Sequence, residues 1–181
     1  DLAVTNVGFH TVSIFLNNGN GTFAGKVDYT TGTTPRSVAI GDVNGDSKAD
    51  LVIANYGSDS ASIFLNNGNG TFANKVDYTT GTNPFTVAIG DLNGDGKPDF
   101  AVENYNSDSV SIFLNNGNGT FAAKIDYTTG SAPYSVAIGD INGDGKPDLA
   151  ITNQFSSSIS VFLNNGNGTF AAKVDYGAGT A

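Results

Sequence analysis

The sequence predicts an all-β protein made of four-stranded antiparallel blades, the architecture of a β-propeller. The first observation is a repeat, because the segment LNNGNGTF and its surroundings recur every 49 residues. The second is the content of each unit, where short segments rich in β-forming residues lie between clusters of Gly, Asn and Asp. The third is that no window combines a helical period with caps. A unit of this length is typical of a propeller blade and too long for one coil of a β-helix.

Each unit is predicted to contain four strands. In the second unit we expect them at residues 37–41, 50–56, 60–66 and 71–78. The second and third strands are almost continuously apolar, which is typical of strands covered on both faces. In the fourth strand, alternation places Phe72, Val76 and Tyr78 on one face. Asn-Gly pairs between the third and fourth strands favour tight hairpin turns, because Asn and Gly tolerate positive φ.

The repeat also predicts the domain organisation. We expect a single repeat domain over residues 1–181, with a partial blade at 1–34, full repeats at 35–83 and 84–132, and a last repeat at 133–181. The chain is fifteen positions short of four complete units, and these positions fall where its two ends would meet. We therefore expect a segment of a longer array, completed by a parent chain or by a second copy.

Composition limits the possible partners. The formal net charge is -9, so a nucleic-acid partner is not expected, since it would need clustered Lys and Arg. No apolar run is long enough for a membrane span, so we expect no membrane insertion. The chain has no cysteine, which excludes disulfides and thiolate metal sites and leaves secretion possible. Cations are the natural counterpart of such a chain.

Three acidic loops are the candidate metal sites, at residues 42–50, 91–99 and 140–148, reading DVNGDSKAD, DLNGDGKPD and DINGDGKPD. Each offers side-chain oxygens at loop positions one, three, five and nine and a backbone carbonyl at position seven, a donor set that suits Ca²⁺. We expect one Ca²⁺ in each loop, three in all. Ser47 replaces a glycine at position six, so the first loop is expected to be weaker. The predicted ligands are Asp42, Asn44, Asp46, Lys48, Asp50, Asp91, Asn93, Asp95, Lys97, Asp99, Asp140, Asn142, Asp144, Lys146 and Asp148, with the lysines acting through their carbonyls.

An EF-hand loop and a simple turn are the two alternative interpretations of these loops. An EF-hand needs a glutamate at position twelve, but Ile53, Val102 and Ile151 stand there, inside a predicted strand. A simple turn needs Asn and Gly but no closing aspartate. Asp1 aligns with Asp50 and therefore resembles the last ligand of a loop whose other residues lie outside the chain.

The repeated D-x-N-G-D-G-x-x-D loop, followed by an apolar strand pair and the NNGNGTF turn, resembles the FG-GAP/VCBS repeat family over essentially the whole chain. That family includes the integrin α-subunit propeller and propeller lectins. The resemblance implies a propeller fold, calcium in the three loops, and a secreted, extracellular or cell-surface setting with an adhesive or carbohydrate-binding role. The chain departs from the family in having only four partial units, where about seven blades are common, and in having Asn at loop position three.

Candidate ligand-binding residues lie on the face opposite the metal loops. In a four-stranded meander the metal loops and the NGNG turns share one face, and the other connections vary between units where the metal-loop face does not. Variable loops on a repeating scaffold are common binding sites, although aromatic residues there could simply fill gaps between blades. The candidates are Arg36, Tyr56, Phe85, Tyr105, Tyr134 and Phe155.

We therefore expect a calcium-stabilised extracellular module for binding or adhesion, recognising a glycan or a protein through these variable aromatic loops. The alternative is a structural repeat element of a surface layer or filament, with copies of the same chain as partners. Enzymatic activity is not expected, because the chain has a single histidine, His10, no cysteine and no Gly-x-Ser-x-Gly motif.

Overall fold

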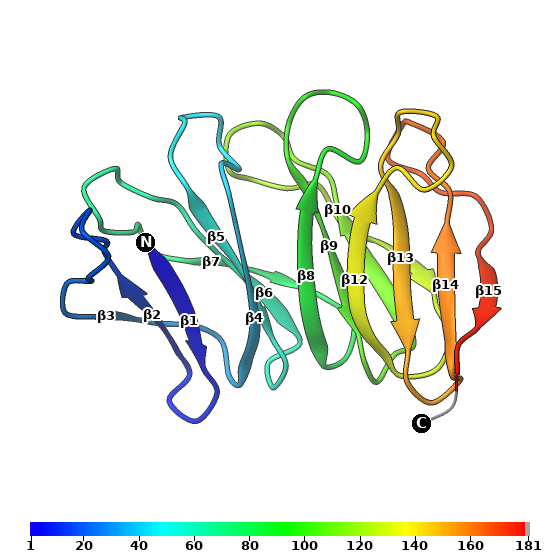
Figure 1. Ribbon diagram of the computed structural model, residues 1–181, viewed down its shortest axis with the longest axis horizontal. Helices are drawn as coiled ribbons and strands as arrows, with labels where there is room; N and C mark the ends of the chain where they lie inside the picture. The colour runs from blue at the N-terminus through cyan, green and yellow to red at the C-terminus, as the bar shows by residue number, and fades with distance from the viewer. Residues whose placement is uncertain (180–181) are drawn as a thin grey trace.

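The structure, a computed structural model describing residues 1–179, is entirely built of β-sheets (Figure 1). Four sheets follow one another in chain order from the N-terminus to the C-terminus. The first sheet has three strands and each of the others has four, all antiparallel and adjacent in chain order. The strands are β1 (Leu2–Asn6), β2 (Thr11–Phe15), β3 (Val27–Thr30), β4 (Pro35–Gly41), β5 (Asp50–Asn55), β6 (Ser60–Phe64), β7 (Val76–Thr79), β8 (Pro84–Gly90), β9 (Asp99–Asn104), β10 (Ser109–Phe113), β11 (Ile125–Thr128), β12 (Pro133–Gly139), β13 (Asp148–Asn153), β14 (Ser158–Phe162) and β15 (Val174–Gly177).

The sheets pack face to face as blades of a β-propeller, which confirms the predicted fold class. The first strands of successive four-stranded sheets lie side by side, β4 against β8 and β8 against β12. The second and third strands are the most buried, and every residue of β5, β6, β9 and β10 is buried. These runs have sheets on both sides, which is why they read as continuously apolar rather than alternating.

The core consists of three apolar clusters, one at each interface between sheets. The first cluster lies between the first and second sheets and includes Ile14, Leu51 and Phe64. The second lies between the second and third sheets, and the third between the third and fourth. Most members of one cluster recur 49 residues later in the next, so one packing solution is repeated along the array.

The predicted fourth strand is wrong in its start and in its faces. The strand β7 begins at Val76 rather than at residue 71, and Phe72 forms only an isolated bridge with Asn66. Phe72 packs edge-on against Tyr29 of the first sheet, whereas Tyr78 packs against Phe121 of the third sheet. Between the bridge at Phe72 and the start of β7 the backbone does not pair with β6, so the alternation of side chains between the two faces of the sheet is interrupted. The rings of Phe72 and Tyr78 therefore contact different neighbouring sheets.

A series of hydrogen-bonded polar side chains crosses each sheet, near the ends of the strands that lie opposite the metal loops. In the second sheet Asn55 Nδ2 donates to Ser62 Oγ (2.8 Å), and Ser62 Oγ donates to Asp77 Oδ1 (2.6 Å). Lys75 pairs with the same aspartate at the surface. Asn55 and Ser62 are fully buried, so these bonds satisfy polar groups that would otherwise destabilise the fold. The corresponding acids in the other sheets are Asp28, Asp126 and Asp175.

Candidate metal loops and aromatic face

The acidic loops join the first and second strands of each four-stranded sheet, and all three project from the same edge of the row of sheets (Figure 1). The NGNG turns lie beside them. The Cα of Gly119 approaches the loop of the preceding sheet so closely that a Cβ there would lie 3.3 Å from the Cβ of Asn44. Asn115 Nδ2 also donates to the carbonyl of Val43 (2.9 Å), which ties this turn to the loop of the neighbouring sheet.

The first residue of each loop organises the loop backbone. Asp42 Oδ1 accepts hydrogen bonds from the N–H groups of Gly45 (2.7 Å) and Asp46 (3.1 Å), and Asp42 Oδ2 accepts one from Ser47 N (2.7 Å). Asp91 and Asp140 accept the corresponding bonds in the other loops. The loops therefore wrap around their first carboxylate.

The fifth loop position carries an exposed carboxylate with a cation beside it. Lys48 Nζ lies 2.9 Å from Asp46 Oδ2, and the equivalent pairs of the other loops are 3.3 and 3.2 Å apart. This hydrogen bond from Lys48 holds the pKa of Asp46 below its usual value. In the other two loops the pKa of Asp95 and of Asp144 is also lowered, chiefly by a backbone N–H donated from the lysine two residues later.

The ninth loop position is buried and links the loop to the NGNG turn. Asp50 Oδ2 accepts a hydrogen bond from Val43 N (2.9 Å), and Asp50 Oδ1 accepts one from Asn66 N (2.7 Å). Burial raises the pKa of Asp50 and of Asp99, and the negative charges of the other two loop aspartates raise it further. The three carboxylates of a loop are thus close enough to repel one another.

The donor set of each loop fits Ca²⁺ in its chemistry, since it consists of carboxylate, amide and carbonyl oxygens. Within residues 1–179, however, no group of three or more acidic, histidine or cysteine side chains converges as a metal site would require. The carboxylates are turned toward backbone N–H groups and toward lysine instead. The predicted ligands of each Ca²⁺ therefore lie within a single loop, but their oxygens do not converge on one point. Calcium binding stays a prediction.

The first loop differs from the others at position six. Ser47 has a φ of 63°, and Gly96 and Gly145 have φ values of 79° and 82° at the same position. Only glycine adopts this left-handed conformation without a steric cost. Ser47 therefore strains the first loop.

The six aromatic-face candidates lie together, at the end of the sheets opposite the metal loops. The guanidinium of Arg36 lies 5.2 Å from the ring centres of both Tyr56 and Phe85. The ring of Phe85 is 4.5 Å from that of Tyr134 and 6.3 Å from that of Tyr105. Tyr105 in turn contacts Phe155 at 6.1 Å. We call these six residues the aromatic strip; they are Arg36, Tyr56, Phe85, Tyr105, Tyr134 and Phe155.

The aromatic strip combines packing with exposure. Tyr56, Phe85 and Tyr105 are half-buried against one another, while Tyr134 is 46% and Phe155 71% exposed. The strip therefore crosses from the second sheet to the fourth along the molecular surface. The sequence did not identify Gln154, which accepts a hydrogen bond from the Tyr105 hydroxyl (3.2 Å) and belongs to the same surface.

His10 has a local structural role. Its Nδ1 accepts a hydrogen bond from Thr34 N (2.9 Å), and the equivalent residues Asp59 and Asp108 accept the same bond in later units. His10, Asp59 and Asp108 all have positive φ near 50°. The imidazole of His10 thus takes the place of the aspartate carboxylates of later units, which accept a backbone N–H from the segment that leads to the next sheet.

Comparison with known proteins establishes the class and then the family. The fold and the repeated loops define a propeller repeat in which an acidic loop joins the first and second strands of each four-stranded sheet. The family model of the FG-GAP-like repeat matches residues 1–53, 42–102 and 99–151, and that of the FG-GAP repeat matches residues 132–174. The chain therefore belongs to the FG-GAP repeat family, and the resemblance seen in the sequence is confirmed.

Solved structures show the same fold at low sequence identity. One is an Agrocybe aegerita lectin described by its recognition of non-reducing terminal N-acetylglucosamine, with 23% identity, a TM-score of 0.61, and coverage of 92% of this chain and 46% of the lectin. Another is a functionally unknown protein of Desulfotomaculum acetoxidans, with 16% identity, a TM-score of 0.67, and coverage of 98% and 57%. The chain thus spans about half the length of these structures. A search of curated protein sequences found no match.

No helix among residues 1–179 has the length and apolarity needed to cross a bilayer.

Proposed function

We propose that this chain is a non-enzymatic, extracellular binding module that recognises a glycan or a protein through the aromatic strip. The observation that carries the proposal is the strip itself, a continuous surface of five rings and one guanidinium drawn from three sheets. Aromatic and arginine side chains dominate binding energies at interfaces because they bury a large area at a small entropic cost.

A glycan suits the strip better than a charged ligand. Tyr134 and Phe155 present exposed ring surface on which the apolar face of a sugar can stack, and Gln154 offers an amide beside them. The only charged member is Arg36, whose guanidinium already lies over two rings. The similar Agrocybe aegerita lectin supports a carbohydrate ligand as a class, without identifying which sugar this chain would bind.

The test is a glycan array with the 181-residue chain in calcium buffer, compared with Tyr134→Ala and Phe155→Ala. We expect binding by the wild type and roughly a five- to thirtyfold loss in either variant, because one stacked ring contributes about 1–2 kcal/mol. Phe9→Ala is the matched control, since Phe9 is 84% exposed and lies outside the strip. A blank array for the wild type, or equal losses in all three variants, would contradict a glycan-binding strip.

We also propose that Ca²⁺ stabilises the fold by binding the three loops. The support is the all-oxygen donor set and the raised pKa of Asp50 and of Asp99, which results first from burial and then from the charges of the other two aspartates in each loop. When bound, the ion would supply positive charge at each loop and no catalysis. A ligand that binds only the folded state stabilises it by about 2.7 kcal/mol at a hundred times its Kd.

Melting curves with calcium and with EDTA test this proposal, together with a native mass measurement. We expect chelation to lower the Tm and the native mass to show three calcium ions. The control is the triple variant Asp42→Asn, Asp91→Asn and Asp140→Asn, whose Tm should not respond to calcium. An equal Tm of the wild-type chain with and without EDTA would refute calcium stabilisation.

Self-association is the second candidate function, as a structural element of a surface layer or filament. It is favoured by exposed apolar side chains on both outer sheets, with Leu2 and Val4 on the first and Ile141 and Tyr176 on the fourth. Sedimentation at increasing protein concentration tests it, and monomers at every concentration would exclude it.

A further inference from the structure

Each four-stranded sheet carries several Asn-Gly pairs, and the fold holds them in different hydrogen-bonded states. In the third sheet Asn93 belongs to the acidic loop, and Asn116 and Asn118 belong to the NGNG turn. An asparagine before glycine can react within the chain, because the glycine nitrogen lies next to the side-chain amide and no Cβ hinders its attack. The reaction requires an available glycine N–H, a carbonyl oxygen that can accept negative charge, and an amide nitrogen that can leave.

The glycine N–H groups of the three pairs differ. Gly94 N donates to Asp91 Oδ1 (2.8 Å), and Gly117 N donates to Asn115 Oδ1 (2.7 Å). Gly119 N donates no hydrogen bond among the described residues. A bonded N–H must break its bond before it loses its proton, and beside Asp91 the resulting anion would also face a carboxylate. Gly119 N is therefore the most available nucleophile of the three.

The side-chain carbonyl of Asn118 is polarised by two donors. Asn118 Oδ1 accepts hydrogen bonds from Thr120 N (3.1 Å) and from Thr120 Oγ1 (2.6 Å). The same hydroxyl accepts a bond from Asn116 Nδ2 (3.0 Å), which strengthens its own donation. Two donors on one carbonyl stabilise the negative charge that develops during attack, as an oxyanion hole does. Among the described residues Asn93 Oδ1 accepts only the N–H of Asp95 (2.9 Å).

The leaving nitrogens differ within the turn as well. Asn116 Nδ2 is bonded to Thr120 Oγ1. Asn118 is exposed, and its Nδ2 donates no hydrogen bond among the described residues. An amide nitrogen in contact with water can take up a proton and leave as ammonia. All three requirements are therefore met at Asn118, whereas Asn116 fails two of them.

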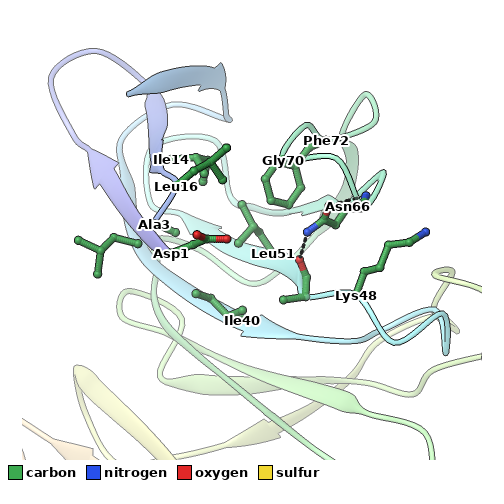
Figure 2. Close-up of a pocket in the computed structure, with 13 residues that line it drawn as sticks. Asp1, Ala3, Ile14, Leu16, Ile40, Lys48, Leu51, Asn66, Gly70 and Phe72 are labelled. Atoms are coloured by element: carbon green, nitrogen blue, oxygen red, sulfur yellow. Dashed lines mark hydrogen bonds between the residues drawn. The ribbon is translucent and has the colours of Figure 1, made fainter. Parts of the chain in front are cut away.

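The base of the turn is anchored to the neighbouring sheet. Asn115 Nδ2 donates to Val43 O across the interface (2.9 Å). Figure 2 shows the equivalent turn of the second sheet, where a dashed line marks the bond from Asn66 to Ala49 O (2.9 Å). The third sheet has a sheet packed on each side, so the state of Gly119 is that of a turn inside the array.

The same arrangement recurs in the other NGNG turns. In each of them the second asparagine accepts both the N–H and the hydroxyl of the threonine two residues later, at Asn20, Asn69 and Asn167. The glycine after the first Asn-Gly asparagine is bonded in each turn, as Gly117 is. The glycines of the other acidic loops are bonded as Gly94 is.

We propose that Asn118 and its equivalents Asn20, Asn69 and Asn167 deamidate spontaneously through a cyclic imide, while the fold protects the other Asn-Gly pairs. Gly119 N loses its proton to solvent and bonds to Asn118 Cγ, and the Cγ–Nδ2 bond breaks as ammonia leaves. Water then opens the ring. Cleavage of the new N–Cγ bond gives aspartate, and cleavage of the bond from the same nitrogen to the backbone carbonyl carbon gives isoaspartate. The amide and water thus become a carboxylate and ammonium, without an oxidant or reductant.

The products alter the metal-loop face. A Cβ at Gly119 would lie 3.3 Å from the Cβ of Asn44, so a carboxylate at position 118 adds negative charge beside the acidic loop of the second sheet. Isoaspartate also lengthens the backbone by a carbon atom, which moves Gly119 relative to Leu65, its other close neighbour. The charge of this face would therefore increase as the protein ages.

The test is to incubate the 181-residue chain in calcium buffer at mildly alkaline pH and to locate the modified residues by mass spectrometry of peptides prepared at acid pH. We expect Asn118 to react at least about tenfold faster than Asn116 and Asn93, since hydrogen bonds that obstruct or assist the reaction change its rate by this order. Enzymatic methylation of isoaspartate identifies the second product. In urea the three rates should become alike, because the Asn-Gly sequence is the same.

Thr120→Val is the matched variant, because it removes the hydroxyl and keeps the shape and the backbone N–H. We expect the rate at Asn118 to fall about fivefold, with the rate at Asn167 in the same molecule unchanged as the control for folding. Equal rates at Asn118 and Asn116 in the folded chain would overturn the proposal. A preference for Asn118 that persists in urea would also overturn it, because local sequence rather than the fold would then select the site.

Discussion

At one buried position the interface between the second and third sheets has an apolar residue, whereas the interface between the third and fourth sheets has an acidic one. Ala54 faces the third sheet from β5, and Glu103 takes the equivalent place on β9, facing the fourth sheet. Both are fully buried. Most other members of the two clusters match in position. The other buried differences between the clusters exchange one apolar side chain for another, as at Phe100 and Leu149, so Glu103 is the change that adds a carboxyl group to the repeated packing arrangement.

Glu103 changes the backbone pairing between β8 and β9. In the second sheet Ser37 pairs with Ala54 directly after Pro35, but in the third sheet pairing resumes only at Val87. The reason is that Thr86 N donates to the Glu103 side chain, Oε1, at 2.7 Å. The other carboxyl oxygen, Oε2, is buried with no partner among the described residues. A repeat array can tolerate such a residue because each interface contributes to stability nearly independently.

Burial raises the pKa of Glu103 to about 8, with the hydrogen bonds from Thr86 opposing the shift. The strands packed around it, β8, β10 and β12, carry no Asp, Glu, His, Lys or Arg. Its own strand begins with Asp99 and the facing β13 with Asp148. No cation offsets the cost of ionising it, so the protonated form is the stable one in the folded state at neutral pH.

Ala54→Glu should produce the largest effect, because it places a second carboxyl group in an interface packed for a methyl group. We expect a loss of roughly 4 kcal/mol in the free energy of unfolding at pH 8, combining overpacking with burial of a charge. Urea unfolding measures it, with Ala54→Val as the control for added volume. A loss no larger than that of the valine variant would show that this interface accepts a carboxyl group without cost.

Glu103→Ala should remove the buried carboxyl group from the third interface and stabilise the protein at high pH. The folded pKa of Glu103 is about 8 and that of an unfolded glutamate about 4.3, so the folded state holds more protons between these values and stability falls as pH rises. We expect a gain of roughly 3 kcal/mol for the variant at pH 9, shrinking toward pH 4. Unfolding curves at both pH values test this sign, and Glu103→Gln separates charge from volume. A gain that does not depend on pH would contradict the raised pKa.

Asn115→Ala and Asn66→Ala compare the loss of stability at the interface between the second and third sheets with the loss at the interface between the first and second. Asn115 bonds across its interface to Val43 O, whereas among the described residues Asn66 bonds only within its own sheet. The loss should be about 1 kcal/mol larger for Asn115, since its removal leaves one more buried carbonyl unsatisfied. Urea unfolding of both variants in the same calcium buffer measures the difference. Equal losses would show that the cross-interface bond adds nothing.

The architecture could be predicted because the same pattern of strands and turns recurs in every unit, so that an ambiguous segment in one unit can be interpreted from the others. The aromatic strip was found in the same way, from positions such as Phe85 and Tyr134 that differ between units while their surroundings do not. The start of β7 was missed because Phe72 and Val76 continue an alternating pattern in sequence although the ladder is interrupted between them.

The roles of individual carboxyl groups outside the acidic loops could not be predicted from the sequence. The burial of Glu103 depends on the fourth sheet packing over it, and nothing in the local pattern of β9 distinguishes it from an exposed glutamate. The series of hydrogen-bonded polar side chains through Asp77 was likewise missed, because an aspartate beside a lysine in an exposed strand predicts only a surface ion pair. In both cases tertiary contacts assign the role of the carboxyl group.

Ser47→Gly should have the smallest effect and compares the same two sheets at the loop rather than at the core. Ser47 has a φ of 63°, and the third sheet has Gly96 at this position. Glycine removes the strain of the left-handed backbone but gives the unfolded chain more freedom, so we expect a net gain of only about 0.5 kcal/mol. The reverse change, Gly96→Ser, should cost a similar amount in unfolding experiments with EDTA. If Ser47→Gly also raises calcium affinity, the strain acts on the binding loop itself; if stability does not change, the first loop already accommodates serine.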